Sequence, residues 1–351
     1  MTGGGRVPGH GYRVPDLDDR SPEPVPRTPV LYLGIDGGQT GTQAVLADAA
    51  GRVLGRGVGG PSNHVEMPGG RDRLRNAVTD STNAALRAAG LGDVTKVTFA
   101  GVYCAMTGEA DFKTEIITPI FRTAALRVEH DAPAALAGAT LGAPGIIVIA
   151  GTGSVVFGEN ADGETSRAGG WGYVFGDEGS GFGLARDGVR AALDALDGVA
   201  PETRLVPVLT AKFGVTDLRL LPMVMYNGHL SRDGVASAAR DVIDTWQAGD
   251  AIAGRVVAHG LDALARRVES VAGRLRLADP LVCLSGGVFR SQPYVEAFAV
   301  AVRARVPRGR VELARLSPAA GAVLLAFRTA GTPVTDAMRE TLVASAHEDC
   351  P

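Results

Sequence analysis

One pattern occurs twice in this chain: an apolar strand ends at a turn of small residues, and another strand follows at once. The first copy spans residues 30–47 with Gly37 and Gly38 in its turn, and the second spans residues 146–159 with its turn at 151–154. Glycine lets backbone N–H groups approach an anion closely, so both turns suit phosphate binding. Either turn alone could equally be a plain hairpin. The repetition predicts two related α/β halves that face a common cleft.

The first half is expected to follow the order βββαβαβα, opening with three short antiparallel strands. Its expected elements are strands at 30–36, 42–47, 53–57, 97–102 and 125–129 and helices at 70–89 and 132–142. The second half is expected to contain strands at 146–150, 155–159, 281–285 and 311–314, a mostly helical stretch at 181–275, and helices from 292 and 318. The predicted fold class is therefore α/β, with two domains.

Composition sets the expected domain boundaries. Residues 1–29 are rich in Gly, Pro, Arg and Asp and hold few large apolar residues, so they cannot offset the entropy lost on ordering. We expect them to form a disordered leader. An N-terminal domain is expected at 30–144 and a C-terminal domain at 145–330, whose last helix is free to pack back on the first. Residues 331–351 are expected to be a C-terminal tail.

Charge and cysteine content limit the classes of partner. The net charge is −3, which gives no electrostatic reason to expect nucleic acid or an anionic membrane, so a small-molecule substrate fits better. Cys104, Cys283 and Cys350 are far apart and form no paired framework, and no apolar run is long enough to span a bilayer. These features predict a cytoplasmic protein. They leave open whether it forms a homodimer.

Asp36 ends the first strand and adjoins the first glycine turn. A phosphate-bound Mg²⁺ usually takes only one or two protein carboxylates, so Asp36 is a candidate metal ligand that acts through a bound water. The alternative is an aspartate that caps the turn. Neither turn matches the nucleotide loop G-x-x-x-x-G-K-[ST], and neither precedes a helix as in a dinucleotide-binding fold. A third pair, Gly286 and Gly287, follows a strand, where it permits close approach of a ring or phosphate or forms a β-to-α turn.

Asp131 directly follows the expected strand at 125–129 and starts a helix. It can cap that helix by accepting backbone N–H bonds. A carboxylate at the carboxyl end of a strand also points into the crevice where α/β sheets bind ligands. The sequence leaves both roles open.

Residues 168–181 hold many glycines together with Trp171, Tyr173 and Phe175, next to Asp177. This composition disfavours a regular helix or strand, and the aromatic residues argue against disorder. Aromatic surface beside carboxylates suits a sugar, which has apolar faces and hydroxyl edges. Asn63 either binds a sugar hydroxyl or makes an Asx turn.

In chain order, the motifs D-G-G-Q-T-G-T, P-S-N-H, H-D-A-x-A-A-L-A-G-A, A-G-T-G-S, G-G-W-G-Y-x-x-G-D-E-G-S-G and S-G-G-V resemble those of the BadF/BadG/BcrA/BcrD ATPase family. Within it they are most similar to the N-acetylglucosamine kinase-like branch. The resemblance runs from about residue 31 to 325. It implies two RNase H-like domains of the actin-like ATPase type, with ATP and Mg²⁺ in the cleft between them.

The resemblance also assigns roles to residues. Asp131 corresponds to the base that deprotonates the sugar's 6-hydroxyl. Asn63, Thr152, Gly170 and Asp177 match sugar-contacting positions, and Trp171 joins them as the aromatic residue of that loop. The implied ATP-binding residues are Gly37, Gly38, Gln39, Thr40, Gly151, Thr152, Gly153, Ser154, Gly286 and Gly287.

The expected activity is ATP-dependent phosphorylation of an amino sugar of the N-acetylglucosamine type at the 6-hydroxyl. Glucosamine, N-acetylmuramate and glucose stay open as acceptors. Two other classes remain as alternatives. One is an ATPase that activates a radical dehydratase, which would need converging cysteine thiolates for an iron–sulfur cluster. The other is a sensor that binds sugar or nucleotide without catalysis, although both Asp36 and Asp131 are present.

Overall fold

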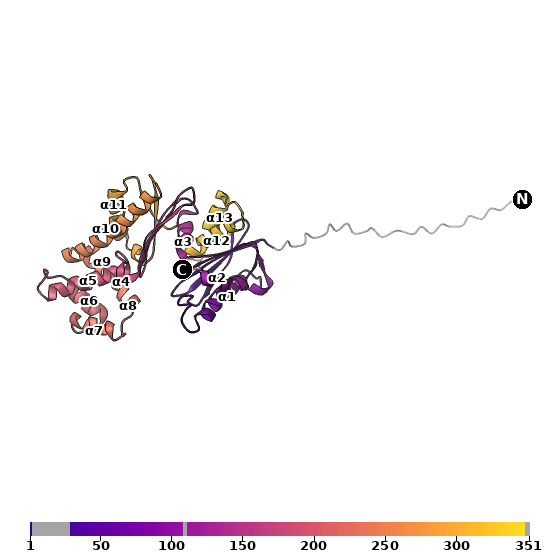
Figure 1. Ribbon diagram of the computed structural model, residues 1–351. Helices are drawn as coiled ribbons and strands as arrows, with labels where there is room; N and C mark the ends of the chain where they lie inside the picture. Colours follow the sequence, from indigo (N-terminus) through magenta and orange to yellow (C-terminus); the bar gives the residue numbers. More distant parts are fainter. Residues whose placement is uncertain (2–28, 108–110, 348–351) are drawn as a thin grey trace.

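The computed structural model describes residue 1 and residues 29–107 and 111–347. The expected leader therefore lies almost wholly outside the described residues. Figure 1 shows two halves, each built on a twisted sheet, with helices α3 and α12 between them. Both sheets have five strands, in the orders β3-β2-β1-β5-β7 and β10-β9-β8-β11-β12. The two orders match position by position, which confirms the internal repeat.

The first sheet begins with the expected antiparallel strands and continues with parallel ones. Its strands are β1 (Leu31–Gly37), β2 (Thr42–Asp48), β3 (Val53–Gly59), β5 (Gly101–Met106) and β7 (Leu126–Glu129). Strand β1 is central: it runs antiparallel to β2 and parallel to β5. Alternate β1 side chains face opposite sides of the sheet, as the period of a strand requires. Leu33 packs toward α1 (Gly70–Ala88), whereas Tyr32 packs toward α12 (Pro318–Thr329).

The second sheet repeats this layout. Its strands are β8 (Gly145–Ala150), β9 (Ser154–Glu159), β10 (Thr165–Gly169), β11 (Leu281–Ser285) and β12 (Arg310–Leu313). Strand β8 is antiparallel to β9 and parallel to β11. One face, which includes Val148 and Leu284, forms a core with the helical layer. The other face, which includes Ile147 and Phe157, packs against α3 (Asp131–Thr140).

Helices α3 and α12 join the two halves by packing on opposite sheets and on each other. Helix α3 packs against β8 and β11, and α12 packs against β1 and β5. Small residues allow these elements to pack closely. Where α12 meets α3, a Cβ built on Gly321 would lie 2.1 Å from the backbone O of Ala134. Where α12 meets β1, a Cβ built on Gly34 would lie 2.4 Å from the backbone N of Val323. Glycine at both positions therefore allows the backbones to approach.

The helical layer of the second half fills the long expected helical stretch. Its helices are α5 (Gly181–Leu196), α6 (Leu205–Phe213), α7 (Leu221–Tyr226), α8 (Arg232–Ala236), α9 (Ala239–Gln247) and α10 (Ala251–Arg274), followed by α11 (Gln292–Arg305). Most of their apolar residues join the largest core cluster. The described residues contain no helix long and apolar enough to cross a membrane.

The structure corrects three expectations. The segment at 331–351, expected as a tail, contains α13 (Asp336–His347), whose buried Leu342 packs with α12. The glycine-rich stretch at 168–181 is not wholly irregular, because it includes the end of β10 and the one-turn helix α4 (Gly172–Phe175). The expected strand at 97–102 divides into β4 (Thr98–Phe99) and β5, and β4 pairs with β6 (Arg122–Thr123) in a separate small sheet. The domain boundaries stay a prediction.

Candidate active site

The first group of candidate residues lies where β1, β5 and α3 meet. Asp36 stands near the end of β1, and burial, followed by the nearby charge of Asp131, raises its pKa to about 7. Gly37 follows it, and a Cβ there would lie 2.5 Å from Ser62 Oγ and 2.7 Å from Met106 Sδ. Glycine is thus required by close packing as well as by the turn. Two carboxylates that influence each other at strand ends form a site that attracts a cation.

Asp131 occupies the first turn of α3 and not its cap. The N-cap residue is His130, with extended backbone angles, so the interpretation of Asp131 as the capping residue is wrong. The hydroxyl of Thr107 instead donates to Oδ2 of Asp131 at 3.2 Å. A carboxylate in the first turn also interacts favourably with the helix dipole. Asp131 is therefore held by α3 on one side and by Thr107 on the other.

Thr107 is a residue that the sequence analysis missed. Its hydroxyl reaches the carbonyl O of Gly37 at 3.2 Å as well as Asp131, and its backbone N–H donates to the same carbonyl at 3.0 Å. The buried Lys113 donates from Nζ to the backbone O of Thr107. Thr107 directly follows β5, at the carboxyl end where parallel sheets bind ligands, and that position was the available signal.

The second group surrounds the turn after β8. Gly151 N donates to Gly153 O at 3.0 Å, which closes the turn. Gly286 has φ of 109°, and a Cβ there would lie 2.4 Å from Ala150 O, so this position requires glycine. The Gly286 backbone therefore lies directly against the 151–154 turn. Gly287 has no atom within 4 Å of its built Cβ and lies open beside it.

Asp177 anchors this turn from the glycine-rich loop. Its Oδ1 accepts from Ser154 N at 2.9 Å, and its Oδ2 accepts from Nη2 of Arg232 at 2.6 Å. Asp177 has φ of 64°, a conformation that Asp adopts more readily than most residues, and it is only 3% exposed. Its neighbour Glu178 pairs with Arg267 and accepts from Ser154 Oγ through its backbone O at 3.0 Å.

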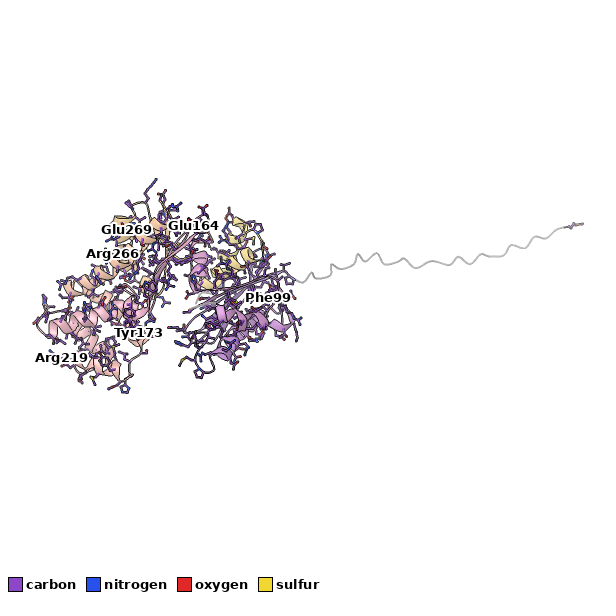
Figure 2. All side chains as sticks on the ribbon, in the orientation of Figure 1. Phe99, Glu164, Tyr173, Arg219, Arg266 and Glu269 are labelled. Atoms are coloured by element: carbon purple, nitrogen blue, oxygen red, sulfur yellow. The ribbon has the colours of Figure 1, made fainter. Side chains whose placement is uncertain are left out.

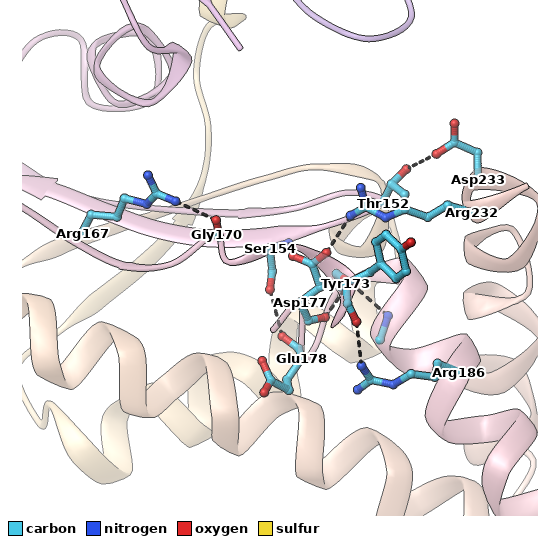
Figure 3. Close-up of polar contacts among 12 residues, drawn as sticks. Thr152, Ser154, Arg167, Gly170, Tyr173, Asp177, Glu178, Arg186, Arg232 and Asp233 are labelled. Atoms are coloured by element: carbon cyan, nitrogen blue, oxygen red, sulfur yellow. Dashed lines mark hydrogen bonds and ion pairs between the residues drawn. The ribbon is translucent and has the colours of Figure 1, made fainter. Parts of the chain in front are cut away.

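Two further residues missed by the sequence analysis come from α8. Arg232 pairs with Asp177, and Asp233 accepts from Thr152 Oγ1 at 2.9 Å, as Figure 3 shows. No sequence signal marked them, because they lie about 80 residues after the turn in a helical stretch with no motif. Their contacts with Asp177 and Thr152 form only in the folded chain, so local sequence does not reveal them.

The remaining predicted residues lie near these groups. Gly170 has φ of 73°, and its carbonyl accepts from Arg167 Nη2 at 2.7 Å. Trp171 is 72% exposed, with the Arg167 guanidinium over its ring, and Tyr173 lies at the edge of the second half nearest the first half in Figure 2. Asn63 is half-buried, and its backbone O accepts from Arg73.

The structure thus brings the predicted residues together in two groups, one on each sheet. Within the described ranges, no hydrogen bond or ion pair joins the group at Asp36 to the group at Asp177. Gln39 and Thr40 are exposed at the first turn. No cluster of three or more His, Cys, Asp or Glu suited to a metal ion occurs among the described residues. Asp36, with Asp131 nearby, still fits Mg²⁺, because a phosphate-bound ion needs only one or two protein carboxylates.

Comparison with known proteins identifies the family to which the chain belongs. The model of the BadF/BadG/BcrA/BcrD ATPase family matches residues 33–326. The chain belongs to that family, and its two halves have the RNase H-like fold of actin-like ATPases.

Three relatives are similar over nearly their whole length. The N-acetyl-D-glucosamine kinase of Dictyostelium discoideum is 28% identical over 85% of this chain and 98% of its own. The N-acetylmuramic acid/N-acetylglucosamine kinase of Clostridium acetobutylicum is 28% identical over 84% of this chain and 97% of its own. A crystal structure of a protein from Chromobacterium violaceum, described as a putative N-acetylglucosamine kinase, has a TM-score of 0.65 and 27% identity and covers 84% of this chain and 98% of its own.

Proposed function

We propose that this protein is an ATP-dependent kinase that phosphorylates an amino sugar of the N-acetylglucosamine type at its 6-hydroxyl, with Asp131 as general base. The observation that carries the proposal is the arrangement of Asp36 and Asp131 at the ends of neighbouring elements, with Thr107 bound to Asp131. Phosphoryl transfer needs a base within reach of the attacking hydroxyl and a cation that neutralises the phosphates. These two carboxylates supply one group for each task.

Asp131 is suited to receive the sugar's proton. Thr107 engages Oδ2, which leaves Oδ1 to accept the proton of the 6-hydroxyl as its oxygen attacks the γ-phosphorus. A hydroxyl has one proton and can donate to one acceptor at a time. When Asp131 is protonated on Oδ1, Oδ2 is a carbonyl oxygen that can still accept from Thr107. The base therefore keeps a fixed orientation in both protonation states.

The two glycine turns are the proposed phosphate sites. Backbone N–H groups of Gln39, Thr40, Thr152 and Gly153 would donate to phosphate oxygens, and Gly37, Gly38 and Gly151 would let the phosphates approach. The N–H groups of Gly38, Gly151 and Ser154 already donate within the protein. Gly286 and Gly287 would border the nucleotide. Asp36 would hold Mg²⁺, which neutralises phosphate charge when bound. Closure of the two halves would exclude water and limit ATP hydrolysis without a sugar.

The proposed acceptor is supported by the relatives and by the loop that bears Gly170, Trp171 and Asp177. Relatives that span nearly the whole chain are named for N-acetylglucosamine and N-acetylmuramic acid. A further relative, a glucosamine kinase of Vibrio cholerae, is 30% identical over 61% of its own length. The residues of this loop, together with Asn63 and Thr152, would offer an aromatic face and polar groups to a sugar. N-Acetylglucosamine is the proposed acceptor, and glucosamine, N-acetylmuramate and glucose are the alternatives that a substrate panel distinguishes.

The alternative of a dehydratase activator has no support in the described residues. Cys104 and Cys283 lie in strands of different sheets, and both are buried. Burial raises the pKa of both thiols, which disfavours the thiolates that an iron–sulfur cluster needs. The sensor alternative requires a site without a working base, and the Asp131 environment argues against it.

The test is ADP release with ATP, Mg²⁺ and a panel of hexoses and amino sugars. The matched pair of variants is Asp131→Asn and Asp80→Asn, the latter removing an exposed carboxylate on α1. We expect sugar-dependent turnover in the wild type and in Asp80→Asn, and a loss of about 10²- to 10⁴-fold in Asp131→Asn. ADP release that is independent of sugar, or unchanged in Asp131→Asn, would overturn the proposal.

A further inference from the structure

Helix α8 supplies two neighbouring side chains to the turn after β8. Arg232 binds Asp177, and Asp233 binds Thr152, so adjacent residues of one helix hold two different residues of the proposed sugar site. Figure 3 shows both contacts at the end of the second sheet that bears the turn. This helix belongs to the helical layer, about 55 residues beyond Asp177. The contacts therefore couple the position of that layer to the geometry of the turn.

The guanidinium of Arg232 is fixed by several groups at once. Its Nη2 lies 2.6 Å from Oδ2 of Asp177, and its central carbon lies 5.4 Å from the ring centroid of Tyr173 and 5.9 Å from that of Phe182. Guanidinium groups are attracted to aromatic faces, and charge-assisted hydrogen bonds are stronger than neutral ones. The side chain is 30% exposed, so it lies at the boundary between the core and the site.

One atom of Arg232 lacks a partner. Its Nε is buried and makes no hydrogen bond, and it shares this state with only Thr82 Oγ1 among the described side chains. Leaving a buried donor unpaired is unfavourable, and such groups are uncommon in native proteins. The other contacts of Arg232 must therefore outweigh this cost. That is consistent with a side chain whose place is set by function and not by packing alone.

Asp177 depends on Arg232 for its charge balance. Its side chain is only 2% exposed, and both of its oxygens are engaged, one by Ser154 N and one by Arg232. A buried carboxylate without its paired cation is strongly unfavourable. Removal of the guanidinium would therefore displace the Asp177 carboxylate. The 151–154 turn would keep its closing bond from Gly151 N to Gly153 O and the bond from Ser154 Oγ to the backbone O of Glu178.

We propose that Arg232 is a positioning residue of the acceptor site, which fixes the Asp177 carboxylate in the geometry that binds the sugar. The inference rests on the proposed function, because Asp177 and Thr152 are its proposed sugar-contacting residues. Arg232 acts through Asp177 and does not itself react. Its loss should weaken binding of the sugar far more than binding of the nucleotide.

The experiment measures binding by isothermal titration calorimetry, separately for N-acetylglucosamine and for ADP with Mg²⁺. The variants are Arg232→Met, Arg232→Lys, Asp177→Asn and the Arg232→Met/Asp177→Asn double variant. The control is Arg240→Met on α9, where the side chain is 88% exposed and faces Asp244 at 3.6 Å. Thermal melting of each variant reports whether the fold persists, and steady-state kinetics give the KM for sugar and for ATP.

We expect Arg232→Met to raise the Kd and KM for the sugar by about 30-fold, in the range of losses for a buried charge pair, and to leave the ADP affinity within about twofold of the wild type. Arg232→Lys should recover part of the sugar affinity, because an ammonium can reach one carboxylate oxygen but lacks the planar fork. The double variant should be less impaired than the sum of the single variants, since the two side chains act as one unit. Arg240→Met should behave like the wild type.

The outcomes separate this inference from the proposed function. If wild-type protein binds and phosphorylates the sugar while Arg232→Met binds it equally well, the inference fails and the function stands. A folded Arg232→Met that loses sugar and nucleotide affinity equally would show a general structural role and overturn the inference too. If Arg232→Met does not fold, the Lys variant decides by the same comparison of sugar and nucleotide affinity. Wild-type protein that binds none of the sugars would remove both claims.

Discussion

The hydroxyl of Thr107 lies 3.2 Å from Oδ2 of Asp131 and also 3.2 Å from the carbonyl O of Gly37. This single side chain thus links the first glycine turn to the proposed base. It connects the end of β5 to α3, so the orientation of Asp131 depends on the packing of the first sheet. The base is held by the fold and not by helix capping.

Thr107 should therefore affect the rate of the chemical step. Thr107→Val keeps the shape of the side chain but removes its donor, and we expect it to lower kcat by about tenfold, since misdirected general bases lose part of a contribution of about 10²- to 10⁴-fold. The KM for ATP should stay within about twofold of the wild type. Thr107→Ser keeps the hydroxyl and is the matched control. Equal kcat values for the Val and Ser variants would contradict a positioning role for this hydroxyl.

Asp36 should make stability depend on pH. Burial, followed by the charge of Asp131, raises its pKa to about 7 from 3.8, so the folded protein favours the protonated form. The stabilising contribution is fully present below pH 3.8 and is lost as the pH rises to about 7, by at most about 4 kcal/mol. Asp36→Asn should remove this dependence and melt at a higher temperature than the wild type at pH 8, with a smaller difference at pH 5. A difference in melting temperature between the two proteins that stays constant from pH 5 to 8 would contradict this assignment.

The same pKa has a consequence for activity. Deprotonated Asp36 is the form that can hold Mg²⁺. We expect kcat/KM for ATP to fall below about pH 7 and the fall to move to lower pH as the Mg²⁺ concentration rises, because the cation favours the charged carboxylate. Initial rates over a grid of pH and Mg²⁺ concentrations test this. If the fall in kcat/KM at low pH does not move with the Mg²⁺ concentration, the fall is due to another group.

Gly286 and Gly287 form a natural comparison at the second turn. An alanine Cβ at Gly286 would lie 2.4 Å from the Ala150 carbonyl and would require φ of 109°, whereas at Gly287 it meets nothing within 4 Å. We expect Gly286→Ala to lower stability by about 1–3 kcal/mol and to weaken ATP binding. Gly287→Ala should leave stability within about 0.5 kcal/mol. Chemical denaturation and nucleotide titration of both variants provide the measurement, and equal effects would contradict the described turn.

The crossing of α3 and α12 gives a second glycine comparison. Gly321→Ala would place Cβ 2.1 Å from the Ala134 carbonyl, and since backbone atoms cannot move aside, we expect a loss of more than about 2 kcal/mol. Gly273 lies in α10 with nothing within 4 Å, so Gly273→Ala should stabilise by about 0.5–1 kcal/mol. Urea denaturation distinguishes the two. A Gly321→Ala protein as stable as the wild type would mean that the two helices are not in close contact.

The fold could be predicted where local pattern and repetition agree. Strands that end at Gly37 and before Gly151 carry both a continuous apolar run and a turn signal, so β1 and β8 were expected within a residue or two of their observed bounds. Helix α13 was missed because its only fully buried apolar residue, Leu342, gives little periodic signal. Its burial depends on the face of α12, which sequence reading does not supply.

The site was predictable only where a residue adjoins a recognisable motif. Asp36 and Asp131 stand beside strand ends, which mark them as candidates. Arg232 and Asp233 lie in a stretch with no motif, and their roles come from contacts with Asp177 and Thr152, which are distant in sequence. The sequence of one chain read by itself gives no signal for such pairs. Thr107 is intermediate, since its strand-end position was visible but its contacts were not.

The central claim is that Asp131 activates the 6-hydroxyl of an amino sugar. The most direct measurement compares ADP release with N-acetylglucosamine and with 6-deoxy-N-acetylglucosamine, in wild-type protein and in Asp131→Asn. We predict rapid release only for the wild type with the complete sugar, because the deoxy compound lacks the attacking oxygen and the variant lacks the base. Equal release with the two sugars, or an Asp131→Asn protein as active as the wild type, would contradict the claim.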